Sequence, residues 1–150
     1  MNDRAVKVLA WMSVAAWLAS WFLPVLEDYS GGAAFLAALK GPLQDSSTRA
    51  PEDAVMQIAS ALTNLVFPIM FAMILRNRVV HPARLLRVAI LCLVIDLYWL
   101  VELVRAGEWS GLLPGYYVWL VAFALMVAIG ITGVVSDRRT SRTPTAGTRP

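Results

Sequence analysis

Four stretches of the chain are almost wholly apolar and are separated by polar segments. They cover about residues 5–26, 54–75, 85–104 and 113–135. A bilayer core about 30 Å thick requires about 20 apolar residues in a helix that rises about 1.5 Å per residue. None of the four stretches alternates apolar and polar residues with a period of two, as a membrane β-strand would. The pattern therefore predicts an all-α fold with four membrane-spanning helices.

The composition supports a membrane location. Hydrophobic residues make up 59% of the 150 residues, and charged residues make up 15%. Soluble domains are typically about 45–50% apolar and about 25% charged. A chain of this length leaves roughly 30% of its surface wet after folding, so one small core cannot hide the surplus of apolar side chains. We expect that surplus to face lipid.

Basic residues gather in alternate polar segments. Ten of the 13 Lys and Arg residues precede the first span, separate the second from the third, or follow the fourth: Arg4, Lys7, Arg76, Arg78, Arg84, Arg87, Arg138, Arg139, Arg142 and Arg149. Cytoplasmic segments of membrane proteins carry an excess of Lys and Arg. The distribution predicts an antiparallel four-helix bundle in the cell inner membrane, with both termini cytoplasmic. It also accounts for the net charge of +3 without a nucleic-acid partner.

The first span is expected to remain on the protein. A basic start before an apolar stretch is also typical of a cleaved signal peptide, and small residues near positions 15–20 offer a cleavage site. However, the stretch is longer than the roughly 7–15 residues of such a peptide, and it contains Trp11, Trp17 and Trp21. Cleavage is the less favoured alternative.

The long connection over residues 27–53 is predicted to lie outside the cell membrane. Within it, SGGAAFLAALKGP favours a short extracytoplasmic helix that Ser30 caps and that Gly41 and Pro42 stop. We interpret this helix as a structured connector, with a lid in the headgroup layer as the alternative. The segment 136–150 is rich in Thr, Arg and Pro and is predicted to be a disordered cytoplasmic tail.

The third span carries an acid in its interior, Asp96. A charged side chain at the centre of a membrane helix costs about 2.5–3.5 kcal/mol on insertion scales, so Asp96 is expected to face the bundle interior or water, or to be protonated. Asn64 in the second span and Trp17 in the first lie at a similar depth, about 12–15 Å from the outer end. Because both have an N–H to donate, we predict that one of them donates a hydrogen bond to Asp96.

Further polar residues share one face of the second span. Gln57, Ser60 and Asn64 recur at spacings of three and four, with Thr63 beside them. We therefore predict an intramembrane polar cluster of five residues: Asp96, Asn64, Gln57, Ser60 and Trp17. Such a cluster is interpreted either as interhelical hydrogen bonding, worth about 0.6 kcal/mol per pair, or as a proton- or ion-handling site at Asp96.

A second acid, Glu102, lies about two residues from the outer boundary of the third span. It can pair with Arg105 at the i, i+3 spacing, so we interpret it as an interfacial charge. The alternative is an outer vestibule formed by Glu102, Tyr98 and Tyr116.

The sequence lacks the motifs of common catalytic and metal sites. It has no HExxH, no CxxC and no Gly-rich phosphate loop, and it contains one His and one Cys. We expect no enzymatic activity, no metal and no cofactor. Small residues in the fourth span, Ala124 with Ala128 and Gly130 with Gly133, predict close helix packing, either within the bundle or between copies of the chain.

Three segments together carry a resemblance to known proteins. They are WFLPVLEDYSGGAAF (21–35), ALTNLVFPIM (61–70) and GLLPGYYVWLVAFALMVAIG (111–130). They resemble a loose set of small bacterial four-span membrane proteins of unassigned function. That set tends to show a proline-ended first span, an aromatic-Asn motif in the second and a GYYxWL entry to the fourth. Thr63-Asn64-Leu65 matches the middle motif only in part, and Asp96 is not in the pattern. The resemblance implies the topology and no activity.

Two functions remain open at this point. The favoured one is a multi-pass membrane protein that acts by association, as an accessory, stabilising or protective subunit. Its partners would be the lipid bilayer and either a second copy of the chain or another membrane protein. The alternative is a small proton- or cation-coupled transporter or channel that uses Asp96 and the polar face of the second span. Four spans are few for a transport path, so this alternative predicts a dimer or larger.

Overall fold

The computed structural model describes residues 3–26, 29–44, 51–76, 81–107 and 111–140. These residues form five helices: α1 (Asp3–Phe22), α2 (Gly31–Gln44), α3 (Pro51–Leu75), α4 (Pro82–Ala106) and α5 (Pro114–Thr140). Two short strands, β1 (Pro24–Leu26) and β2 (Tyr29–Ser30), pair antiparallel. The predicted all-α class is confirmed, with this small hairpin as the one addition in the described residues.

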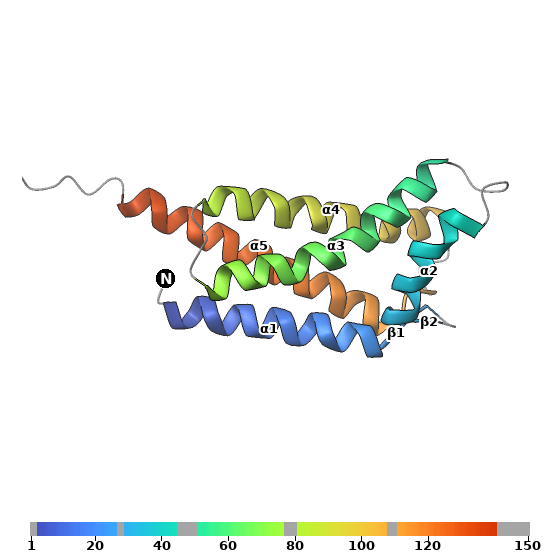
Figure 1. The fold of residues 1–150 in the computed structure, drawn as a ribbon, viewed down its shortest axis with the longest axis horizontal. Coiled ribbons are helices and arrows are strands. Elements are labelled where there is room, and N and C mark those ends of the chain that lie inside the picture. Colours follow the sequence, from blue (N-terminus) through green and yellow to red (C-terminus); the bar gives the residue numbers. More distant parts are fainter. Residues whose placement is uncertain (1–2, 27–28, 45–50, 77–80, 108–110, 141–150) are drawn as a thin grey trace, which may run out of the picture.

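The four long helices run lengthwise beside one another, and α2 lies steeply inclined at one end of them (Figure 1). Helix α5 packs along both α1 and α4. Helix α3 crosses obliquely, with its first half near α2 and α4 and its last half near α1 (Figure 1). Because α1 begins and α5 finishes opposite α2, we call the two ends of the molecule the termini end and the α2 end.

Three helical segments are long and apolar enough to cross a membrane: Arg4–Phe22, Asp53–Leu75 and Pro114–Arg138. Their outward surfaces carry exposed large hydrophobic side chains such as Trp11 and Ile69. Soluble proteins rarely expose such extended apolar surfaces. The three helices therefore support a membrane-embedded, transmembrane protein.

Helix α4 differs from these three in its charges. It has 25 residues, but each 18-residue stretch of it contains three charged residues. The charged residues of α4 are Arg84, Arg87, Asp96, Glu102 and Arg105. The fourth predicted span is thus present as a helix of sufficient length, and its position in a membrane depends on where those charges lie.

The end of α1 differs from the prediction because the chain turns at Pro24. Helix α1 ends at Phe22 rather than near residue 26, and residues Pro24–Leu26 form β1. The Gly31 N–H donates to the Leu23 carbonyl at 3.1 Å, which brings the start of α2 against the end of α1. A Cβ on Gly31 would collide with the Ser20 carbonyl oxygen, so this close approach requires glycine.

Two predicted boundaries are wrong. Ser30 caps α2 as predicted, since its Oγ accepts the Ala33 N–H at 3.4 Å, but α2 continues past Gly41 and Pro42 to Gln44. Helix α5 continues to Thr140, because no proline or glycine follows Gly133 until Pro144, so the tail is not disordered from residue 136. Residues 141–150 lie outside the described residues.

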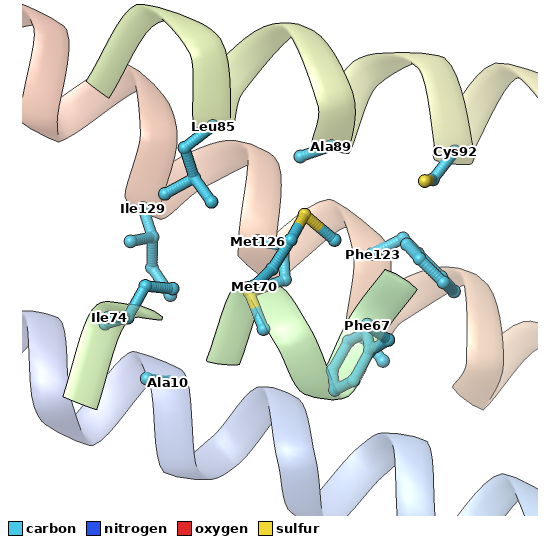
Figure 2. Close-up of a cluster of buried hydrophobic side chains, with 11 residues drawn as sticks. Ala10, Phe67, Met70, Ile74, Leu85, Ala89, Cys92, Phe123, Met126 and Ile129 are labelled. Carbon is cyan, nitrogen blue, oxygen red and sulfur yellow. The ribbon is translucent and has the colours of Figure 1, made fainter. Parts of the chain in front are cut away.

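The hydrophobic core fills the half of the molecule nearer the termini end. Figure 2 shows side chains from α1, α3, α4 and α5 directed toward one another. The members with no exposed surface include Ala10, Phe67, Ala89, Phe123 and Met126. This packing closes the space between the helices on the termini side of the polar residues described below.

Glycines on α5 allow this close packing. A Cβ on Gly130 would lie 2.9 Å from the Leu86 Cα, and one on Gly133 would lie 3.0 Å from the Pro82 Cβ. The two glycines therefore form a contact seam with α4 inside the chain. Ala124, by contrast, is exposed.

Candidate functional site

Asp96 lies inside the molecule because it belongs to the buried stripe of α4. The buried residues of this helix are Leu85, Ala89, Cys92 and Asp96, at spacings of four, three and four, so they share one face. Asp96 has no exposed surface. The prediction that Asp96 faces the interior is confirmed.

Two hydroxyl groups of α3 contact one oxygen of Asp96. The Ser60 Oγ lies 3.2 Å from Asp96 Oδ1, and the Thr63 Oγ1 lies 3.1 Å from the same atom. The Thr63 hydroxyl also donates to the Ser60 carbonyl oxygen at 2.7 Å. The other carboxyl oxygen, Oδ2, is buried and has no hydrogen-bond partner among the described residues.

Asn64 joins three helices a short distance from this group. Its Oδ1 accepts the indole N–H of Trp17 from α1 at 3.1 Å and that of Trp119 from α5 at 3.2 Å. Its Nδ2 reaches the Ser60 carbonyl oxygen at 3.5 Å. The predicted bond from Asn64 or Trp17 to Asp96 is therefore wrong in its pairing: Trp17 bonds to Asn64, and Asp96 takes the hydroxyl groups instead.

The angular positions on α3 explain this pairing. A helix turns about 100° per residue, so Asn64 is rotated by about 40° from Ser60 in one direction and Thr63 by about 60° in the other. Ser60 and Thr63 consequently face α4, whereas Asn64 faces α1 and α5. Four of the five predicted residues, Asp96, Ser60, Asn64 and Trp17, belong to two hydrogen-bonded groups connected at Ser60, and Gln57 lines the cavity described below.

The three residues of the alternative outer vestibule make different contacts. Glu102 pairs with Arg105 at 2.9 Å on the surface, as the i, i+3 spacing predicted. Tyr98 donates to Asp53 Oδ1 of α3 at 3.3 Å. Tyr116 is only 2% exposed, and its hydroxyl donates to the Asp96 backbone carbonyl. The three residues therefore serve three different contacts.

A partly open cavity of about 700 Å³ lies at the α2 end. Its walls come from the end of α1, the β-hairpin, α2 and the facing parts of α3, α4 and α5. Aromatic side chains line much of it, including Trp21, Phe35, Trp99, Tyr116 and Trp119. This size and lining are typical of pockets that bind small molecules or side chains of a partner.

The polar part of the cavity wall comes mainly from α3. Gln57, Ser60 and Asn64 all line the cavity, and Lys40 of α2 is the charged residue of the described lining. Asp96 lies behind Ser60 and does not line the cavity. The predicted polar face of the second span is therefore a cavity wall, and Asp96 is one hydroxyl group away from it.

Two contributors were not assigned to the cluster from the sequence. Thr63 lies beside the polar face, and its position one turn after Ser60 is the available signal. For Trp119 the available signal is weaker: a buried indole N–H generally requires an acceptor. Among the described residues, no three His, Cys, Asp or Glu side chains lie close enough together to bind a metal ion.

The chain was compared with protein-family models, curated proteins and solved structures. None of the three comparisons finds a match. The function is therefore inferred from the geometry alone.

Proposed function

We propose that the chain is a four-span protein of a bacterial inner membrane, with both termini cytoplasmic. The burial of Asp96 supports α4 as the fourth span, because the charge in its middle is turned away from lipid. The outward face of α4 presents aliphatic side chains instead, such as Leu91 and Val94 at 59% and 58% exposure. The remaining charges of α4 lie within its first six or last five residues, where they can reach the headgroups.

Site-specific labelling tests this topology. The native Cys92 is buried, so a thiol introduced at an exposed site gives the main signal for a membrane-impermeant maleimide. In intact cells we expect labelling of Ala106→Cys at the α2 end and no labelling of Arg138→Cys at the termini end. Labelling of both sites from the same side would refute the arrangement.

Within that topology, the protein acts by association at its outer face, as an accessory or stabilising subunit rather than an enzyme. The cavity at the α2 end is the observation that carries this proposal. It lies at one end of the molecule, and the hydrophobic core fills the space between the helices toward the other, so one chain offers a binding site rather than a passage. A membrane-protein partner that inserts a side chain or short segment would fill it.

Photo-crosslinking tests the association. A photoreactive residue at Leu36 lies on α2 and lines the cavity, whereas one at Leu91 faces outward from α4. We expect a discrete crosslinked protein from position 36 only. Ala61 lines the cavity and is 2% exposed, so Ala61→Trp should block the cavity and abolish the crosslinked product. Leu62→Trp, on the exposed face of α3, should not abolish it. Equal products from both positions, or none, would refute the proposal.

One observation favours a second candidate function. The unpartnered Oδ2 of Asp96 is a buried polar atom of the kind found at proton and ion sites in membrane proteins. In an oligomer, Asp96 and the polar wall of α3 would serve proton- or cation-coupled transport. Flux in reconstituted vesicles that is lost in Asp96→Asn would support transport, and flux that survives the substitution would refute a role for this residue.

A further inference from the structure

The hydrogen-bond geometry around Asp96 restricts where hydrogens can lie. The Thr63 hydroxyl has one hydrogen, and it has two acceptors within reach. The Ser60 carbonyl oxygen is at 2.7 Å and Asp96 Oδ1 is at 3.1 Å. If the shorter contact holds the Thr63 hydrogen, the longer contact joins two oxygens and needs a hydrogen of its own.

A proton on Asp96 Oδ1 supplies that hydrogen and completes an uninterrupted chain. Ser60 then donates to Asp96 Oδ1, Asp96 donates to Thr63, and Thr63 donates to the Ser60 carbonyl oxygen. The unpartnered Oδ2 becomes the carbonyl oxygen of a neutral acid. A neutral carbonyl without a partner is far less costly to bury than half of a carboxylate charge. We propose that Asp96 is a proton-binding site. The proton lies on Oδ1, donates a hydrogen bond to Thr63 and exchanges with the cavity through Ser60.

Ser60, Thr63 and Asp96 can also form hydrogen bonds with one another when Asp96 has lost its proton. When the proton leaves Asp96, the Thr63 hydroxyl turns from the Ser60 carbonyl oxygen to Asp96 Oδ1. Ser60 and Thr63 then both donate to the carboxylate, and hydrogen bonds to a charged acceptor are stronger than those between neutral groups. The side chains need only rotate hydroxyl hydrogens, so the proton is exchangeable rather than permanently fixed.

A metal cation fits this arrangement less well than a proton. Hard cations are held by several oxygens arranged around them. Here the side-chain oxygens approach only Oδ1, and Oδ2 has no partner among the described residues. The proton therefore matches the one-sided contact that the structure shows.

Proton exchange has one open route. Ser60 lines the cavity, so exchange follows when the Asp96 proton turns from Thr63 to the Ser60 oxygen and the Ser60 hydrogen turns toward the cavity. Asp96 then passes its proton to Ser60 as Ser60 passes its own hydrogen to water in the cavity. Toward the termini end, Cys92 and Ala89 continue the buried stripe of α4 into the apolar core. Within the described residues, the site is therefore approached from the α2 end.

Few titratable groups face this site. On α4 the Cys92 thiol lies one turn away, and from α5 the Tyr116 hydroxyl bonds to the Asp96 backbone carbonyl. Helix α3 faces Asp96 with the hydroxyl groups of Ser60 and Thr63. Lys40 of α2 lines the cavity on the far side of Ser60. The inference does not depend on the partner proposed above.

Infrared spectroscopy of the full chain in vesicles tests the proton site. We expect a carboxylic-acid C=O band at neutral pH that shifts in D₂O and is lost in Asp96→Asn. Thr63→Val removes the acceptor and should raise the frequency of this band. The matched control is Thr132→Val on α5, where the hydroxyl bonds to the Ile129 carbonyl at 2.7 Å and does not contact Asp96. If Asp96→Asn does not assemble, isotope-labelled aspartate with Thr63→Val assigns the band.

The exchange route has its own control. Ser60→Ala should slow hydrogen–deuterium exchange of the band about tenfold, the factor that about 1.4 kcal/mol of barrier represents. Ser20→Ala should leave it unchanged, since Ser20 lines the same cavity but bonds to the Trp17 carbonyl. Any one of four results would overturn the proposal. The acid band is absent, or Thr63→Val does not shift its frequency. Alternatively, the band exchanges as fast in Ser60→Ala as in the native chain, or it is lost when Na⁺ is added.

Discussion

Replacing Asn64 with leucine should destabilise the fold through two helices at once. Its Oδ1 accepts indole hydrogen bonds from Trp17 and Trp119, at 3.1 and 3.2 Å. Leucine has a similar size but no acceptor, so both N–H groups would lose their partner. Polar pairs in membrane proteins contribute about 0.6 kcal/mol each on average, so two bonds predict a loss of about 1.2 kcal/mol in the free energy of unfolding.

The assay is unfolding in mixed micelles by increasing sodium dodecyl sulfate, followed by circular dichroism. A background with both Trp17→Phe and Trp119→Phe serves as the control, because phenylalanine retains a ring and lacks the N–H. In that background Asn64→Leu should change the free energy of unfolding by close to nothing. The difference in this free energy between the two backgrounds measures the two indole hydrogen bonds. If the cost is equal in the two backgrounds, Asn64 does not act as the shared acceptor.

Three further predictions concern the helix contacts. Gly130→Val should cost about 1–3 kcal/mol in the same assay, because a Cβ there meets Leu86, and Ala124→Val on the exposed face should be nearly neutral; equal costs would refute the seam. Ser13→Ala should cost about 0.6–1.7 kcal/mol, because its buried Oγ donates to the Ala122 carbonyl of α5 at 2.7 Å, and an unchanged stability would contradict this bond. Glu102→Gln should change the unfolding free energy by less than about 0.5 kcal/mol, because the Glu102–Arg105 pair is exposed; a larger loss would indicate a buried role.

The interior position of Asp96 was predictable from the sequence because one physical cost determined it. A charge in a membrane helix must avoid lipid, and the buried residues of α4 lie on the stripe that includes Asp96. The partner of Asp96 was not predictable from depth alone. Depth placed Asn64 and Trp17 near the level of Asp96, but the rotation of α3 decides which of its side chains meets α4.

The cavity could not be predicted from the sequence for a related reason. Its wall combines residues from α1, the hairpin, α2, α3, α4 and α5, so it depends on how all of these elements meet. The burial of Tyr116 is a similar case. An aromatic residue near the start of an expected span is typical of the membrane interface, yet its hydroxyl reaches the Asp96 carbonyl in the interior. Helix ends were also misjudged where local signals competed, as at Pro42 in α2.

The central place of α5 has a consequence for synthesis of the chain. It leaves the ribosome after the other four described helices, yet it packs along both α1 and α4 and supplies the partners of Ser13, of Asn64 through Trp119, and of the Asp96 carbonyl. Until α5 inserts, the Ser13 hydroxyl lacks its acceptor on Ala122, and Asn64 has one indole donor instead of two. A nascent chain interrupted before α5 should therefore be a substrate for membrane quality-control proteases, because the bundle closes only after α5 has been made.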